Sequence, residues 1–433
     1  MPVLNYRFSI WTVLVVLGAA GISTVASAAD LAGNCCGDLE ERIAELEATT
    51  VRKGNRKVSV TVSGFVNEAI FFWDDGVERN AYTGTNSLEQ GRVKVSGKAK
   101  VDGDWSAGYT LEFGLSGNPS NAFAQDVDST SPSPSVRKSV WFVEHKTLGK
   151  LTVGQDGTST YHVLDDSNFV NSRGYSDAEA AAIAMGAFRL RTGGVLQNVQ
   201  WSQILGGFNN NTAGQGGRRN IVKYDSPAIA GFSVSASWGE DDMWDAALSY
   251  RGEAGDFKIG AKAGYGETTD NNDTGSCAVV GTRRDCQWWG VSATIQHIPT
   301  GLFLYGGYGQ QMDDNAKRVL GASAEDTNST AYIQGGIEQK VFAIGKTVVF
   351  GEYRKDEAGS PEVARTLIGH ANSIRESEFD FWATGIVQSI DAAAMDVYVI
   401  YRHAEGVTTD FTSQAKTPID GFDMIMMGAR IQF

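Results

Sequence analysis

The sequence lacks any long apolar run after residue 28, although the chain has 433 residues. A transmembrane helix needs about 20 consecutive apolar residues, so helices that span a membrane are excluded beyond that point. Proline is scarce, with 8 residues, whereas glycine is abundant, with 51. These features do not exclude a transmembrane β-barrel, because each barrel strand shows only a weak alternating pattern.

Basic residues are outnumbered: 37 Lys and Arg stand against 51 Asp and Glu, and the formal net charge is −14. This balance excludes the basic footprint of a nucleic-acid-binding protein, so we expect no nucleic-acid partner. Histidine is also scarce, and its residues form no metal-ligand spacing and no clear nucleophile pairing. They are His145, His162, His297, His370 and His403. We therefore predict no metal, no cofactor, no catalytic residue and no enzymatic activity.

Only four cysteines are present. Cys277 and Cys286 are separated by eight residues, a short loop that an oxidising periplasm would close, so we predict a disulfide between them. Cys35 and Cys36 are adjacent, and they either pair between chains or remain free.

The N-terminus has the pattern of a secretory signal peptide over residues 1–28. Arg7 precedes an apolar run from Ile10 to Ala20, and Ala26-Ser27-Ala28 is a small-x-small cleavage site. We assign 29–56 to a periplasmic segment. Within it, 38–51 shows a short heptad pattern, which predicts either a coiled coil between chains or a lone solvated helix.

From residue 57 onwards the dominant period is two, which predicts β-strands. Val58, Val60 and Val62 alternate with Ser59 and Thr61, and segments of similar length recur as far as residue 433. Seven short turns alternate with eight other, mostly longer and polar, connections. This arrangement predicts sixteen strands in an all-β, antiparallel transmembrane barrel over 57–433, located in a bacterial outer membrane. A large soluble β-sandwich is the less favoured alternative.

The last strand ends on Phe433, with Ile425, Met427 and Ile431 on the same face. An aromatic terminal residue on an apolar face is typical of a strand that closes a membrane barrel, with its last ring in the aromatic girdle. We interpret Phe433 as an assembly signal.

If the apolar face contacts lipid, the opposite face lines an aqueous channel. Alternation then places many cations on the channel wall, and the row that begins at Arg92 is the densest. The predicted pore-lining basic residues are Arg92, Lys94, Lys98, Lys100, Arg219, Lys223, Lys258 and Lys262. Cations held beside a narrow wall of low dielectric bias the passage of ions.

The longest connection is 157–217, and we expect it to fold into the barrel. An inward fold would oppose its acidic residues to the wall cations and narrow the passage; the alternative is an external loop over the mouth. The candidate acidic residues are Asp165, Asp166, Asp177 and Glu179.

Residues 57–433 resemble the Gram-negative porins, especially the general-diffusion porins of alphaproteobacteria. The resemblance is carried by the stretches 218–239, 148–155 and 60–67 and by Phe433. It implies a sixteen-strand homotrimer whose third loop folds into each pore. Arg92, Lys94, Lys98 and Lys100 would form the basic side of the constriction, and the loop acids would face them. The loop lacks the Pro-Glu-Phe-Gly-Gly-Asp pattern of enterobacterial porins.

The resulting hypothesis is a weakly ion-selective channel for passive diffusion of ions and small hydrophilic solutes, with a slight preference for anions. Its expected partners are outer-membrane lipid, lipopolysaccharide and the barrel-assembly machinery. The alternative function is structural: the barrel anchors the envelope, with 38–51 contacting peptidoglycan or another envelope layer. A hydrolase using His162 beside Asp165 and Asp166 is a weak third hypothesis.

Overall fold

The computed structural model describes residues 58–132, 134–205, 212–240, 242–269, 285–314, 316–317, 321–359, 367–370 and 373–433. The predicted signal peptide, the heptad segment 38–51 and Cys277 lie outside these ranges, so the assignments made for them stay predictions. Within the described ranges, none of the helices has the length and apolar character that crossing a membrane requires.

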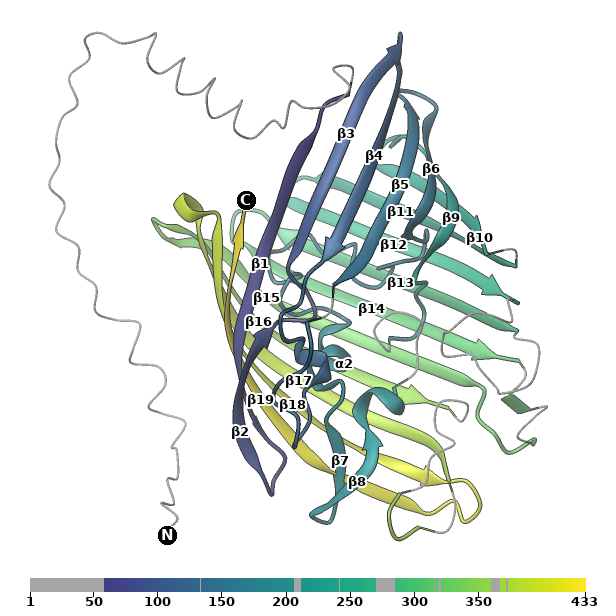
Figure 1. Ribbon diagram of the computed structural model, residues 1–433, viewed down its shortest axis with the longest axis vertical. Helices are drawn as coiled ribbons and strands as arrows, with labels where there is room; N and C mark the ends of the chain where they lie inside the picture. Colours follow the sequence, from purple (N-terminus) through teal and green to yellow (C-terminus); the bar gives the residue numbers. More distant parts are fainter. Residues whose placement is uncertain are drawn as a thin grey trace, which may run out of the picture. The chain divides into compact units, whose positions relative to one another are not determined.

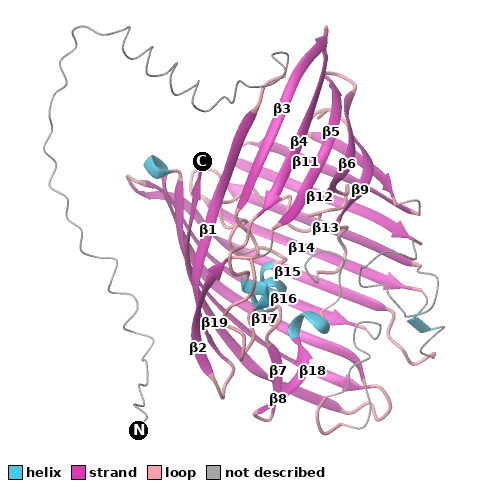
Figure 2. Ribbon diagram, in the orientation of Figure 1, coloured by secondary structure: helices cyan, strands magenta, loops and turns pink. Residues whose placement is uncertain are grey.

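Strands make up nearly all of the regular structure (Figure 2). In the first half of the chain they are β1 Thr61–Asp74, β2 Arg79–Thr85, β3 Arg92–Asp102, β4 Trp105–Gly114, β5 Ser135–His145, β6 Gly149–Gly157, β7 Arg189–Thr192, β8 Val195–Gln200 and β9 Arg218–Asp225. The second half contains β10 Phe232–Gly239, β11 Met243–Ala254, β12 Phe257–Thr268, β13 Cys286–His297, β14 Leu302–Asp313, β15 Thr327–Phe342, β16 Gly345–Ala358, β17 Ile374–Ile390, β18 Met395–Asp410 and β19 Lys416–Gln432. The short helices are η2 Ser120–Ala122, α2 Ala180–Met185, η3 Trp201–Gln203 and η5 Asp391–Ala393.

The large sheet closes on itself through β1 (Figure 1). One edge of β1 pairs with β19, from Phe65 opposite Gln432 to Asp74 opposite Asp423. Its other edge pairs with β3 in its first half and with β2 in its second half. β2 and β3 follow one another along the same edge of β1, so together they occupy one strand position of the barrel. The 17 strands of the sheet therefore occupy sixteen positions. The predicted sixteen-strand antiparallel barrel is confirmed.

Side chains alternate between the two faces of the wall, as a period of two requires. On β9, Val222 and Tyr224 are 38% and 42% exposed on the outer face, whereas Ile221 is buried and Lys223 points to the inside. Apolar residues exposed in this way recur around the barrel, which suits a surface that contacts lipid.

The seven predicted short turns lie where the structure has its short connections, but several predicted loops were drawn too long. Segment 74–88 contains β2, β16 extends to Ala358, and β18 and β19 are joined by only 411–415. These extensions are polar, and Val407 pairs with Pro418 as part of one continuous ladder. Backbone pairing continues without apolar alternation there, so the sequence pattern could not reveal it.

The segment between β6 and β9 lies against the inner face of the wall. The Thr160 hydroxyl donates to Asp245 on β11 at 2.5 Å, and the Tyr175 hydroxyl donates to Asp396 on β18 at 2.6 Å. The Ser176 hydroxyl donates to Glu352 on β16 at 2.7 Å. These three partners lie on widely separated strands, so the segment crosses the interior of the barrel.

An aromatic cluster anchors the β7–β8 hairpin and the turn after it to the wall. Phe188 lies 5.2 Å from Trp73 and 4.8 Å from Phe422, measured between ring centroids, and Trp201 lies 5.0 Å from Phe379. All five rings are almost fully buried. The expectation that the whole inner face borders water is therefore wrong on this side, because the inward segment covers it.

The two ends of the barrel sequence meet where β1 and β19 close the ring. The backbone N–H of Gly64 donates to the Phe433 carbonyl at 2.9 Å, and the Phe433 N–H donates to the Gly64 carbonyl at 3.0 Å. A Cβ built on Gly64 would lie 2.7 Å from the Phe433 ring, so only glycine fits at this contact without displacement. The role of Phe433 in assembly stays a prediction.

Cys286 is the first residue of β13; it is buried, and its sulfur is disulfide-bonded. Because its predicted partner Cys277 is outside the described residues, the identity of the pair stays a prediction.

Candidate functional site

Two cavities lie side by side inside the barrel. The larger has a volume of about 660 Å³ and the smaller about 460 Å³. Six residues line both cavities, and we call this shared ring the neck. The neck consists of Glu89, Arg92, Arg137, Tyr161, His162 and Arg218. Cationic side chains thus predominate where one cavity leads to the other.

Wall strands supply the neck arginines. Arg92 begins β3 and binds Glu89 at 2.5 Å, while its other terminal nitrogen lies 3.6 Å from Glu112 on β4. Arg137 on β5 binds the same Glu112 oxygen through its Nε at 3.0 Å. The two glutamates therefore offset the charges of Arg92 and Arg137.

Arg218 differs from the other two arginines. It begins β9, its guanidinium donates to the Tyr161 hydroxyl, and its Cζ lies 4.9 Å from the centroid of the Tyr161 ring. Within the described ranges, no carboxylate lies within ion-pair distance of Arg218, although Glu179 is near enough to act on it electrostatically. A cation over an aromatic face is stabilised without being neutralised, so Arg218 leaves about one positive charge at the neck.

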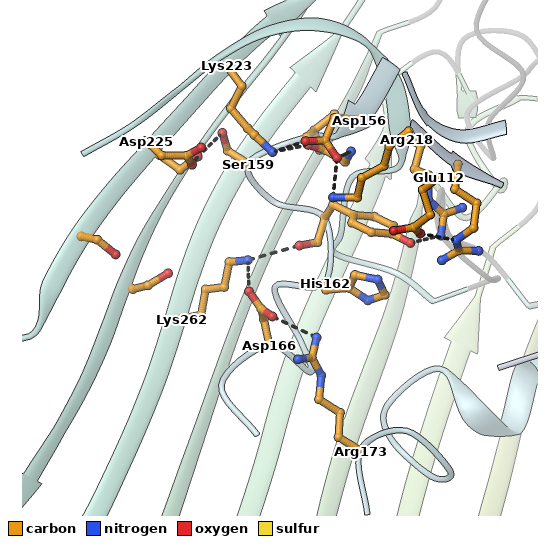
Figure 3. Close-up of a pocket in the computed structure, with 18 of the residues that line it drawn as sticks. Glu112, Asp156, Ser159, His162, Asp166, Arg173, Arg218, Lys223, Asp225 and Lys262 are labelled. Atoms are coloured by element: carbon orange, nitrogen blue, oxygen red, sulfur yellow. Dashed lines mark hydrogen bonds and ion pairs between the residues drawn. The ribbon is translucent and has the colours of Figure 1, made fainter. Parts of the chain in front are cut away.

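The larger cavity continues the excess of cations (Figure 3). Asp156 on β6 lies between Lys138 at 2.8 Å and Lys223 at 3.2 Å. Asp166 on the inward segment lies between Lys262 at 2.9 Å and Arg173 at 2.9 Å. Each of these carboxylates therefore has two cationic neighbours.

A third cavity, of about 530 Å³, continues from the larger one. Val170, Asn171 and Arg173 line both, and Lys346 and Ser389 lie farther along. Lys346 and Ser389 are close to the short turns after β15 and β17, which lie at the end of the barrel where the predicted short turns are. The three cavities therefore form a series inside the wall, with Arg173 at the second junction.

His162 is at the centre of a cluster on the inward segment. Its Nδ1 lies 3.1 Å from Asp165 Oδ1 and 3.0 Å from Glu179 Oε1. Arg173 binds the other oxygen of Asp165 at 3.0 Å, and Gln215 donates to Glu179 at 2.8 Å. The backbone of His162 is left-handed, with φ of 59°, a conformation that is uncommon for a non-glycine residue.

The cluster carries perturbed pKa values. Burial alone would lower the pKa of His162, but the charges of Asp165, Tyr161 and Glu179 raise it well above the usual value. Burial, reinforced by Asp165 and Glu179, raises the pKa of the Asp177 carboxyl well above its usual value. Burial alone would also raise the pKa of Asp166, but Lys262 and Arg173 hold it below its usual value.

The predicted loop acids therefore have different positions. Asp165, Asp177 and Glu179 are 1%, 5% and 1% exposed, and they belong to the interior of the inward segment. Asp166 has a half-exposed side chain and lines the larger cavity. Which of the four oppose the wall cations stays a prediction: Asp165, Asp177 and Glu179 have partners within their own segment, and Glu179 also lines the smaller cavity.

The predicted wall cations also divide. Arg92, Lys223 and Lys262 line the cavities. Lys94, Lys98, Lys100 and Lys258 share the inner face by register but do not line the cavities described above. Of these, Lys98 binds Glu144 at 2.5 Å, and Lys258 lies over the Phe169 ring. Arg219 binds Glu240 at 2.8 Å and is absent from the cavity linings, whereas its neighbour Arg218 is in the neck.

Several cavity cations are absent from the predicted set, and Arg137, Lys138 and Arg218 show why. Arg137 and Lys138 are consecutive, and strict alternation would place only one of them inside. A β-bulge opposite Glu112 and Phe113 shifts the register at this point. Arg218 lies at the first position of β9, where alternation had favoured Arg219. The sequence signal was that Arg218 and Arg219 are adjacent cations at the end of a strand, so either side chain could point into the barrel.

Comparison with known proteins agrees with this architecture. A family model described as Gram-negative porin matches residues 12–417. The anion-selective porin from Comamonas acidovorans aligns with a TM-score of 0.57 at 16% identity, covering 87% of this chain and 100% of that one. OmpT, an outer membrane protein of Vibrio cholerae, aligns with a TM-score of 0.52 at 18% identity, covering 88% and 99%.

OmpF of Salmonella typhi, in complex with daunomycin, aligns with a TM-score of 0.52 at 13% identity, covering 88% of this chain and 99% of that one. No curated protein sequence matches the chain. The similarity to solved structures is one of fold, and the predicted alphaproteobacterial subfamily stays a prediction. The family match extends over most of the sequence and agrees with the closed sixteen-strand barrel. The chain therefore belongs to the Gram-negative porins, which are channels of the outer membrane rather than enzymes.

Proposed function

We propose that this porin is a diffusion channel that prefers small anions, and that its narrowest charged passage is the neck. The observation that carries the proposal is Arg218: it lines both cavities, and no carboxylate in the described ranges pairs with it. A fixed, unneutralised charge beside a narrow aqueous path raises the local concentration of counter-ions.

The charges along the path support the same direction. Lys138 and Lys223 share Asp156. Lys262 and Arg173 share Asp166, and Arg173 also binds the buried Asp165. Of the four predicted loop acids, Asp165 and Asp177 are buried and line none of the cavities described above, whereas Asp166 lines the larger cavity and Glu179 the smaller one. One protein of the same fold is an anion-selective porin, so the fold accommodates such a preference.

In this proposal, the segment between β6 and β9 is the constriction element. Its Tyr161 and His162 complete the neck opposite the wall arginines, and its Asp166 reaches the larger cavity. We also propose a homotrimer, which rests on family membership alone. The envelope-anchoring alternative depends on 38–51, outside the described residues, and no observation favours it.

The decisive test is the reversal potential of the purified protein in a planar bilayer across a potassium chloride gradient. The expected sign is that of a chloride-preferring channel. A reversal potential of the opposite sign would overturn the preference for anions, and a failure of correctly folded, inserted protein to conduct would overturn the assignment as an open channel.

A further inference from the structure

The cluster around His162 brings together donor atoms in an arrangement that permeation alone does not require. Three potential ligand atoms converge there: His162 Nδ1, one oxygen of Asp165 and one oxygen of Glu179, all within 4.8 Å of one another. An imidazole with two carboxylates is a common ligand set for zinc and similar divalent transition metals. We infer that this cluster is a binding site for a divalent transition metal, of which Zn²⁺ is the best fit.

The spacing of the donors matches this ion. Zinc lies about 2.0–2.2 Å from nitrogen and oxygen ligands, so two ligands of a tetrahedral ion are about 3.3 Å apart. The two distances from His162 Nδ1 are 3.1 Å to Asp165 and 3.0 Å to Glu179. These two distances need to open by only a few tenths of an ångström. The Asp165 and Glu179 oxygens lie within 4.8 Å of each other, so they would have to approach by at most about 1.5 Å.

The surrounding residues orient the ligands. Arg173 holds the second oxygen of Asp165, through its Nε at 3.1 Å, so that Oδ1 remains directed at His162. Gln215 donates to Glu179 at 2.8 Å. Outer contacts of this kind fix the orientation of metal-binding carboxylates and contribute to affinity.

Asp177 is an independent sign that the cluster has capacity for a cation. It is 5% exposed, and it interacts electrostatically with Asp165, Glu179 and His162. Its Oδ1 accepts the backbone N–H of Glu179 at 2.8 Å, but among the described residues no side chain donates to it and no cation pairs with it. Asp177 thus adds a third buried carboxyl to the surroundings of His162, an accumulation of acidic groups that suits a bound cation.

The site would open towards the permeation path, because His162 lines both cavities. The ion would displace the imidazole proton, so the charge of +1 on His162 would be replaced by the charge of +2 on the metal. Because protons and metal compete for the same nitrogen, the affinity for the metal would fall at low pH. The charged groups that act on His162 are Asp165, Asp166, Asp177 and Glu179. Arg173 binds Asp165, and Tyr161 contacts the His162 ring. Bound zinc would also link the part of the inward segment that contains His162 and Asp165 to the part that contains Glu179.

The experiment measures zinc binding to the full-length protein in detergent by competition with a chromogenic chelator, after the cysteine thiols have been alkylated. We expect one site in each chain that prefers Zn²⁺ to Mg²⁺. The variants His162→Gln and Glu179→Gln should each weaken binding by at least about 10-fold. The matched control is His403→Gln, since His403 also contacts a carboxylate, Asp423, at 2.8 Å but lies outside the cluster; its affinity should equal that of the wild type.

Zinc X-ray absorption on the wild-type protein provides a second measurement that needs no variant. The expected spectrum has a nitrogen and oxygen shell without sulfur. Equal affinity in the wild type and in His162→Gln, or a sulfur-containing shell, would overturn the proposal. Because binding is measured without permeation, this outcome is independent of the ion preference of the channel.

Discussion

Arg218 lies over the ring of Tyr161, with 4.9 Å between the guanidinium carbon and the ring centroid, and donates to the same residue's hydroxyl. This contact joins the start of β9 to the inward segment at the neck. The arginine is positioned by a neutral partner, so its charge is held in place without being cancelled. In contrast, Arg92 and Arg137 share Glu112.

Arg218→Gln should reduce the preference for anions. A unit charge about 6 Å from an ion in water contributes about 0.7 kcal/mol, which corresponds to about a threefold change in local ion concentration. The reversal potential in a salt gradient should therefore move towards zero, and Arg218→Glu should move it further. The neighbouring variant Arg219→Gln is the control, because Arg219 binds Glu240 and does not line the cavities. An equal shift in both glutamine variants would contradict the role of Arg218.

Opposite shifts are expected from the two partners of one ion pair in the larger cavity. Asp166→Asn leaves Lys262 and Arg173 without this carboxylate and should strengthen the preference for anions. Lys262→Gln removes a cation and should weaken it. Each effect should be about as large as that of Arg218→Gln, or smaller where the partner side chains rearrange. Shifts of the same sign in both variants would show that the pair acts through loop position rather than through charge.

Trp201→Ala should loosen the inward segment. Trp201 is 1% exposed and lies 5.0 Å from Phe379, between ring centroids. Loss of a buried tryptophan side chain costs about 3–5 kcal/mol, through lost burial and the cavity left behind. We expect faster hydrogen exchange in 188–205, measured by mass spectrometry, and noisier single-channel current. Trp238→Ala, on the outer face and 56% exposed, should leave both unchanged; unchanged exchange in Trp201→Ala would exclude the aromatic anchor.

Acidification should release the β7–β8 hairpin. Arg191 binds Asp75, in the turn after β1, at 2.7 Å. Burial alone would raise the pKa of Asp75, but the Glu78 N–H and Arg191 lower it below its ordinary value of 3.8. The stabilisation is therefore present above that value and is lost as pH falls through the lower pKa of the folded state.

Hydrogen exchange over 189–200, corrected for intrinsic rates, should increase in acid. Asp75→Asn should produce the increase already at neutral pH. Asp74→Asn is the control, because Asp74 accepts only the Gly76 N–H at 2.9 Å among the interactions described. If Asp75→Asn leaves the protection against exchange unchanged, the ion pair between Asp75 and Arg191 does not stabilise the hairpin.

The barrel could be predicted from local pattern, because strand alternation and turn composition are properties of neighbouring residues. Val222, Lys223 and Tyr224 show this, since their faces follow from sequence alone. The neck could not be predicted in the same way. Arg137 reaches it through a bulge, and Arg218 reaches it at a strand end where alternation had selected Arg219.

The His162 cluster illustrates the same limit. Its three donors are 3 and 14 residues apart in a segment that is mostly irregular, so the route of the backbone, and not a helix or strand period, brings them together. The aromatic cluster is similar, because Trp73 and Phe422 are far apart in sequence and lie on a face expected to be wet.

The sequence by itself determined the class of protein: an outer-membrane barrel with lipid-facing apolar residues and a charged interior. This followed because every strand has the same simple period and the membrane imposes one requirement on all outer faces. Only the tertiary structure decided which charges remain unpaired on the permeation path. That outcome depends on the route of one segment across the interior, which buries Asp165, Asp177 and Glu179 and leaves Arg218 beside Tyr161.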